Sequence, residues 1–229
     1  MFDSTNNKLN VSSGESSQRV SPVVYHEFFT TSTFSPFLNA AVVSGTVGTG
    51  NGTADHPGII RLNCSTSANS GYYIGSHSNS LLLGGSEEAN IIFNIQTTTN
   101  TTIRLGFHTS TSSADAADGV YLEINGTTAT GKTANNSSRS STGTTGTLTI
   151  STWYRARISM NSNATIATFT VYDDSGTVVW TDTLATNIPT ARNTGIAICA
   201  TNSGSGSALV LVDLDYMGIS FGTLTRGGI

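Results

Sequence analysis

The chain has 229 residues, of which only 10% are charged, and its formal net charge is −4. Serine and threonine make up about 30% of it, so hydroxyl groups stand where most soluble proteins carry charges, which average about 25%. Nucleic-acid binding needs clustered Lys and Arg, and a membrane span needs roughly 20 apolar residues. Neither is present, and residues 1–7 lack the basic and apolar segments of a signal peptide. We therefore expect no nucleic-acid partner, no membrane insertion and no leader.

Short runs rich in Val, Ile, Thr, Tyr and Phe recur along the chain, bounded by Gly, Asn, Asp and Ser, and such runs predict β-strands. The predicted strands cover residues 23–30, 40–45, 58–64, 71–75, 89–97, 102–109, 119–125, 144–150, 153–161, 164–173, 176–183, 195–201 and 208–221. No segment has the apolar stripe of an amphipathic helix. The pattern predicts an all-β fold, a two-sheet antiparallel sandwich of jelly-roll type.

We expect one domain over residues 21–229, preceded by a polar N-terminal arm over residues 1–20. Residues 126–145 are low in complexity and are expected to form either a flexible loop or polar edge strands. The run 173–176, Asp-Asp-Ser-Gly, has the composition of a hairpin turn.

Alternation assigns side chains to the two faces of the last predicted strand. The apolar face, expected in the core, carries Val210, Val212, Leu214 and Tyr216. The opposite face carries Asp213 and Asp215, which we expect to accept hydrogen bonds from loop amides or to pair with Arg155 or Arg157. The run 153–160 alternates in the same way, which places both arginines on its outward face.

The two cysteines, Cys64 and Cys199, lie in apolar strand-like runs far apart in the sequence. We expect two free buried thiols that pack as small apolar groups. The alternative is a disulfide, which would need the two to meet in space in an oxidising compartment.

A metal candidate precedes the predicted strand at 119–125. Asp115 and Asp118 stand before Gly119, and a loop carboxylate pair of this kind can supply oxygen ligands to Ca²⁺. The favoured alternative is an Asp-capped turn that leads into the strand. We expect no cofactor, with Ca²⁺ as the one candidate ion.

The stretch from Trp153 to Phe221 carries a resemblance to a known family. It contains Trp-Tyr-Arg-Ala-Arg-Ile-Ser at 153–159, Phe-Thr-Val-Tyr-Asp-Asp-Ser-Gly at 169–176, Asn-Ile-Pro-Thr at 187–190 and Val-Asp-Leu-Asp-Tyr at 212–216. These motifs, in this order, resemble the concanavalin A-like (laminin-G-like) jelly-roll domains of tailed-bacteriophage virion proteins, of the decoration, head-fibre or tail-fibre type. The resemblance covers roughly residues 58–221.

Residues 2–11, Phe-Asp-Ser-Thr-Asn-Asn-Lys-Leu-Asn-Val, resemble a short strand motif of phage fibres. The two resemblances imply a virion protein, attached to other virion proteins through residues 1–20 and assembled as a homo-oligomer, with a trimer favoured. It would be displayed as a capsid decoration, a head fibre or a tail-associated protein, with host surface glycans as candidate ligands.

Catalysis is not expected. Retaining glycoside hydrolysis needs two carboxylates about 5–5.5 Å apart, and the Glu-x-Asp-x-x-Glu or Glu-x-Asp-x-Glu strand of jelly-roll glucanases is absent. Two alternatives to a structural virion protein stay open: a lectin-like carbohydrate-binding module, and a disfavoured polysaccharide-degrading enzyme. The aromatic residues that could stack on sugar are Tyr72, Tyr73, Trp153 and Trp180.

Overall fold

The computed structural model describes residues 2–3, 8–9, 24–29, 37–43, 45–50, 52–76, 79–97, 99–204 and 209–222. These residues form strands and connecting segments without any helix, which confirms the predicted all-β class. A helix able to cross a membrane is accordingly not found in the described part of the chain.

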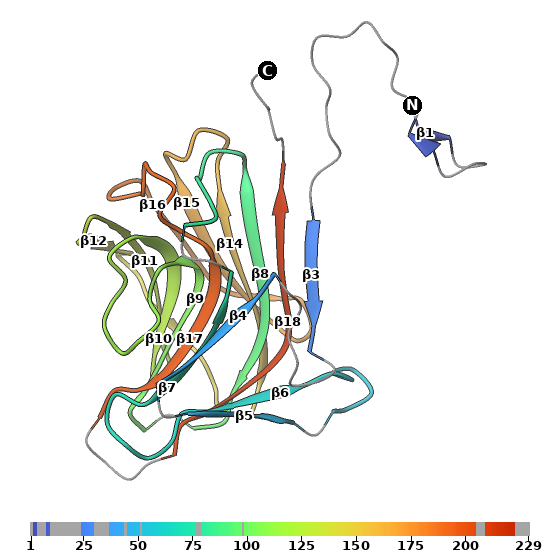
Figure 1. The fold of residues 1–229 in the computed structure, drawn as a ribbon, viewed down its shortest axis with the longest axis vertical. Helices are drawn as coiled ribbons and strands as arrows, with labels where there is room; N and C mark the ends of the chain where they lie inside the picture. Colours follow the sequence, from blue (N-terminus) through green and yellow to red (C-terminus); the bar gives the residue numbers. More distant parts are fainter. Residues whose placement is uncertain are drawn as a thin grey trace, which may run out of the picture.

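Two eight-stranded antiparallel sheets build the domain. The first, called the β10 sheet, contains β4 (Asn39–Val43), β7 (Gly71–Gly75), β9 (Thr101–His108), β10 (Gly119–Asn125), β11 (Thr128–Asn135), β12 (Ser138–Ser141), β13 (Gly146–Thr147) and β17 (Ile196–Asn202). The second, called the β14 sheet, contains β3 (Val24–Phe28), β5 (Thr46–Thr49), β6 (Ile60–Asn63), β8 (Glu87–Ile95), β14 (Trp153–Met160), β15 (Ala167–Asp173), β16 (Val178–Leu184) and β18 (Leu211–Phe221). Figure 1 shows them as two layers, with β9, β10 and β17 in one and β8, β14 and β18 in the other.

The sheets enclose one main apolar core. Its largest members come from both layers, and Phe93, Leu105, Phe107 and Phe169 are all fully buried there. Alternation explains the packing, because β14 has an unbroken half-exposed and buried alternation from Trp153 to Met160. The two-sheet sandwich is therefore the architecture that the sequence predicts.

The low-complexity run at 126–145 forms paired strands rather than only a loop. β11 pairs with β10 from Thr128 to Ala134, and β12 lies at the edge of the β10 sheet. This agrees with the polar-edge-strand alternative. Strand β5, by contrast, was not predicted, because its short sequence, Thr-Val-Gly-Thr, is largely exposed and has too little apolar content.

The prediction for Tyr216 is wrong. Val210, Val212 and Leu214 are fully buried as expected, but Tyr216 is half-exposed and Met217 occupies the core instead. The pairing of β18 with β8 shifts between Leu214 and Tyr216, so one extra residue is inserted there as a bulge. Beyond it, the inward and outward positions of β18 exchange.

The predicted hairpin at 173–176 is present. Gly176 donates its backbone N–H to the Asp173 carbonyl at 3.0 Å and has a φ of +85°, which glycine adopts without the steric penalty of a side chain. The turn joins β15 to β16 and carries Asp174 at its tip.

The arm predicted over residues 1–20 lies mostly outside the described residues. Two short pieces of it are described: β1 (Phe2–Asp3) and β2 (Lys8–Leu9) pair antiparallel as a separate two-stranded unit. Attachment to other virion proteins through residues 1–20 stays a prediction.

A candidate ligand-binding face

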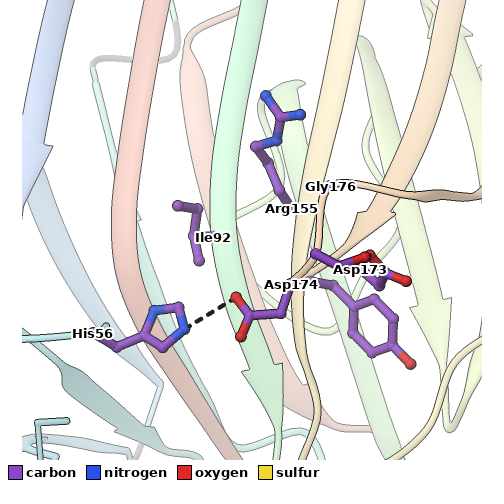
Figure 2. Close-up of a pocket in the computed structure, with 8 residues that line it drawn as sticks. His56, Ile92, Arg155, Asp173, Asp174 and Gly176 are labelled. Carbon is purple, nitrogen blue, oxygen red and sulfur yellow. Dashed lines mark hydrogen bonds and ion pairs between the residues drawn. The ribbon is translucent and has the colours of Figure 1, made fainter. Parts of the chain in front are cut away.

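A pocket of about 290 Å³ opens on the outer face of the β14 sheet. It is lined by His56, Ile92, Tyr154, Arg155, Asp173, Asp174, Ser175 and Gly176. These residues come from the segment before β6, from β8, from β14 and from the β15–β16 hairpin (Figure 2). Its volume is at the lower end of ligand pockets, which measure about 300–1,000 Å³.

His56 connects four segments at one side of this pocket. Its Nδ1 lies 2.9 Å from Oδ2 of Asp215, and its ring stacks on Trp153 with centroids 4.1 Å apart and planes 19° apart. Its Nε2 lies 3.3 Å from Oδ1 of Asp174 (Figure 2). That second contact lacks hydrogen-bond alignment, so it becomes an ion pair only when the imidazole is protonated. The tip of the hairpin thus lies close to the sheet face, beside His56.

The turn before β6 fixes the position of His56. The His56 backbone N–H donates to Oγ1 of Thr53 at 3.2 Å, and the Thr53 N–H donates back to the His56 carbonyl at 2.9 Å. This local bonding orients the imidazole toward β14 and β18.

The carboxylates at the pocket are already engaged with protein groups. Asp173 accepts hydrogen bonds from the Ser175 hydroxyl at 2.6 Å and the Thr177 backbone N–H at 2.8 Å, which stabilise the turn. These bonds, led by the Ser175 hydroxyl, hold the pKa of Asp173 below its ordinary value. Asp174 faces His56, as described above, so the hairpin presents no unengaged pair of carboxylates.

Arg155 differs from the other arginines of this face. Its guanidinium carbon lies 4.1 Å from the centre of the Tyr172 ring, a cation–π contact. Among the described residues, no carboxylate oxygen lies within 4.0 Å of it, whereas Arg61 and Arg157 each have an acidic partner. Arg155 is therefore the cation that the pocket offers to a ligand.

The predicted pairing of Asp213 and Asp215 with Arg155 or Arg157 is wrong. Asp213 forms a two-point contact with Arg61, at 2.6 Å to Nε and 2.7 Å to Nη2, and Asp215 binds His56. The reason is the strand order: β8 lies between β14 and β18, so the aspartates of β18 find their partners on the β6 side.

Arg157 instead pairs with Glu88 of β8, with Nε 2.7 Å from Oε2. Burial alone would raise the pKa of Glu88, but the hydrogen bonds from Arg157 and Asn90 hold it below its ordinary value. All four predicted polar residues thus make defined contacts, with partners that the sequence did not identify.

Three of the four aromatic candidates for sugar stacking are buried. Tyr72, Tyr73 and Trp180 are 6%, 4% and 8% exposed, too little to present a ring to a sugar. Trp153 alone is half-exposed and borders the pocket through its stack on His56.

A second bulge explains Trp180. The register of β15 and β16 shifts so that Val178 pairs with Tyr172 but Trp180 pairs with the core residue Val171. Trp180 is thereby turned inward, where its Nε1–H donates to Oγ1 of Thr144 at 3.2 Å.

The two aspartates proposed for Ca²⁺ lie on the β10 sheet, away from the pocket. Asp115 has Oδ1 3.1 Å from Nε of Arg104 and Oδ2 3.1 Å from Nζ of Lys132, and it accepts a hydrogen bond from Tyr121. Asp118 accepts the Asn136 backbone N–H at 2.9 Å. Both aspartates thus contact β9, β10, β11 or the residue that follows β11. The described residues contain no group of three or more His, Cys, Asp or Glu side chains able to hold a metal ion.

The expectation of two free buried thiols is confirmed. Cys64 lies in the main core, whereas Cys199 packs with Tyr73 and Ala197 on the opposite side of the β10 sheet. Burial raises the pKa of Cys64 to about 12 and that of Cys199 to about 11, so both remain protonated thiols at neutral pH.

Sequence reasoning missed His56, Asp174 and Ile92. Nothing in the spacing marks His56, whose partner Asp215 is 159 positions away. Only the β15–β16 turn was recognised, and its composition alone could not show that Asp174 reaches the neighbouring sheet face.

Known structures share this fold at low sequence identity. A crystal structure titled as a protein of unknown function, SO2946 from Shewanella oneidensis MR-1, aligns with a TM-score of 0.73 and 18% identity, over 93% of this chain and 92% of that one. The CBM2 module of the evolved Dit of Lactobacillus casei BL23 phage J-1 aligns with a TM-score of 0.61 and 12% identity, over 91% and 100% of the two chains. The carbohydrate recognition domain of Emp47p aligns with a TM-score of 0.56 and 12% identity, over 92% and 100%.

These likenesses establish a lectin-type, concanavalin A-like jelly-roll fold. No curated protein matches the sequence. The sequence profile described as "SO2946-like, C-terminal domain" matches residues 55–215, which is more than half of the chain, and the protein therefore belongs to the SO2946-like family.

Proposed function

We propose that this chain is a non-enzymatic recognition module displayed on a bacteriophage particle, where it binds host surface glycans through the pocket on the β14 sheet. The observation that carries the proposal is the pocket itself, in which Arg155 stands without an acidic partner beside the hairpin and His56. Concave sites with a few fixed polar groups and nearby aromatic rings are typical of small-ligand binding.

The phage assignment draws on two observations. The motifs between Trp153 and Phe221 resemble those of virion jelly-roll domains, and one structural neighbour is a module of a phage protein. The chain would be a capsid decoration, head fibre or tail-associated protein. Residues 1–20 would attach it to other virion proteins, and it would assemble as a homo-oligomer, with a trimer favoured.

A non-enzymatic role is supported by the acidic groups at the pocket. Glycoside hydrolysis uses one carboxyl group as an acid and a second as a nucleophile or base. Here Asp173 is held by its turn and Asp174 faces His56. Neither is placed opposite a second unengaged carboxylate across the pocket.

The test is a binding assay with the purified full chain on an array of bacterial capsule, cell-wall and exopolysaccharides, with reducing-sugar release measured on every polymer bound. We expect saturable binding without release of reducing ends. Absence of binding to every polymer would overturn glycan recognition, and turnover would overturn the non-enzymatic role. Failure of the chain to bind phage particles that lack it would overturn the virion assignment.

A lectin that acts free of any particle is the second candidate, favoured by the lectin-type fold. The two candidate functions differ in whether the chain associates with phage particles. A free lectin would bind the same polymers but would not associate with virions, and deleting residues 1–20 would leave its behaviour unchanged.

A further inference from the structure

Six side chains form one continuous row across the outer face of the β14 sheet. Strand pairing places them next to one another, in the order Phe28, Tyr216, Ile92, Arg155, Tyr172 and Val178. Directly paired residues project from the same face of a sheet, so the whole row shares the side on which the pocket opens. The row continues the pocket in both directions across the strands.

Apart from Arg155, the side chains of the row are apolar or aromatic, and the row is accessible to solvent. Phe28 is 64% and Val178 49% exposed, while Tyr216 and Tyr172 are half-exposed. A contiguous exposed apolar surface of this kind is typical of an interaction site, whereas apolar residues scattered singly over a surface are not.

Tyr216 is half-exposed, and its ring lies over Gly218 of the same strand. A Cβ atom built on Gly218 would come within 2.6 Å of Cζ of Tyr216, so the glycine makes room for the ring directly against the strand. Phe28 packs beside it with centroids 5.2 Å apart, and His26 bonds its hydroxyl. The ring is thereby fixed in an orientation in which a flat apolar group, such as the C–H face of a sugar ring, can pack on it.

Arg155 stands in the middle of the row and is held by its contact with Tyr172. A guanidinium without an acidic partner offers a planar fork of donors that matches a carboxylate in two-point geometry. The neighbouring Arg157 does not compete for the ligand, because Glu88 neutralises it. Arg155 is the one charged member of the row, whereas Asp173 and Asp174 line the hairpin side of the pocket, so the favourable position for an anionic group is directly against the guanidinium.

The length of the row exceeds a single sugar. From Phe28 on β3 to Val178 on β16 there are five steps between neighbouring strands, and at about 4.8 Å a step this spans roughly 24 Å. A sugar chain that placed one ring in the pocket of about 290 Å³ would bring further rings against the aromatic residues on both sides.

We infer that the row binds an extended, carboxylate-bearing polysaccharide, whose chain crosses the strands of the β14 sheet and whose acidic sugar lies at Arg155. The inference rests on the proposed glycan-binding function and specifies the ligand class and its direction. Uronic-acid polymers and sialic-acid polymers share this chemistry.

The experiment uses the full chain and pairs of polysaccharides in which each acidic polymer is tested beside its carboxyl-reduced, neutral form. Wild type is compared with Arg155→Gln, Arg155→Lys, Tyr216→Ala and Gly218→Ala, and with Leu82→Ala as control. Leu82 is 52% exposed but lies in the connection between β7 and β8, outside both sheets.

We expect binding to at least one acidic polymer and at least tenfold weaker binding to its reduced form. Because two-point contacts to a charged group contribute about 1.5–3 kcal/mol, Arg155→Gln should weaken the binding about 10- to 100-fold, with Arg155→Lys intermediate. Tyr216→Ala and Gly218→Ala should weaken binding to long oligomers more than to the monosaccharide. Leu82→Ala should bind as wild type, and thermal melting identifies any variant that fails to fold.

The outcomes separate the two claims. Equal binding to an acidic polymer and its reduced form, or binding only to phosphate-bearing polymers, overturns the carboxylate inference and leaves glycan recognition standing. Affinity that does not rise from monosaccharide to longer oligomers overturns the extended mode. No binding to any polymer overturns the proposed function as well.

Discussion

Two histidines of this chain have opposite environments. His56 lies at the pocket between Asp174 and Asp215, so one carboxylate is close to each ring nitrogen. His108 is fully buried in the β10 sheet, with Nε2 3.2 Å from the Arg104 carbonyl and no partner for Nδ1 among the described residues. Sequence alone gave no reason to distinguish them, because each sits in a run of ordinary polar and apolar residues.

Burial of His108 predicts a pH-dependent stability. Desolvation lowers the pKa of His108 to about 4, against an ordinary value near 6.5. Between pH 6.5 and pH 4 the imidazole of His108 is protonated in the unfolded chain but stays neutral in the folded chain. The free energy of unfolding therefore falls as the pH drops from 6.5 toward 4. We expect a loss of about 2 kcal/mol between pH 8 and pH 5 from this group.

Urea unfolding of wild type and His108→Gln at pH 8 and pH 5 measures that loss. Glutamine is neutral at both values and its amide can still donate to the Arg104 carbonyl, so the variant should lack most of the difference. An equal loss of stability in both proteins would contradict the assignment.

At the level of single residues, the sequence predicts the orientation of charged side chains well, but it does not identify the partners of those side chains. The outward orientation of Arg155 and Arg157 follows from the clean alternation of β14. The pairing of Asp213 with Arg61 could not be predicted, since it depends on β6 lying next to β18, a contact between residues 152 positions apart.

At the level of elements, two bulges decide which side chains reach the outer face of the β14 sheet. The bulge in β18 turns Tyr216 outward, and the shift between β15 and β16 turns Trp180 inward. Period-two reasoning fails at both places for the same reason, because one inserted residue exchanges the faces of everything beyond it. Most strand positions could be predicted from the sequence. Which side chains face the core beyond a bulge could not.

The two tryptophans should therefore respond differently to truncation. Trp180→Ala removes a buried ring and should destabilise the fold by about 3–5 kcal/mol, with ligand affinity of the folded fraction unchanged. Trp153→Ala removes the half-exposed ring that stacks on His56, so it should weaken ligand binding with a smaller loss of stability. Chemical denaturation and binding isotherms on both variants check this, and weakened binding only in Trp180→Ala would reverse the assignment.

At the scale of the whole molecule, the fold class was accessible from the sequence because a dozen short strands with turn residues between them admit few arrangements. The pocket on the outer face of the β14 sheet could not be predicted from the sequence. It is assembled from the turn before β6, from β8 and β14, and from the β15–β16 hairpin, which only the sheet order brings together. The low charge of the chain has a specific consequence here. Arg155, for which the described residues provide no acidic partner within 4.0 Å, stands in an otherwise apolar row.

The central claim is that the outer face of the β14 sheet is the ligand-binding surface. It is tested most directly by nuclear magnetic resonance titration of the isotopically labelled full chain with an acidic oligosaccharide from a polymer that it binds. We predict that shifted resonances cluster on Phe28, Tyr216, Ile92, Arg155 and Tyr172, and that they vanish in Arg155→Gln. Shifts confined to the β10 sheet, around Asp115 and Asp118, would contradict the claim.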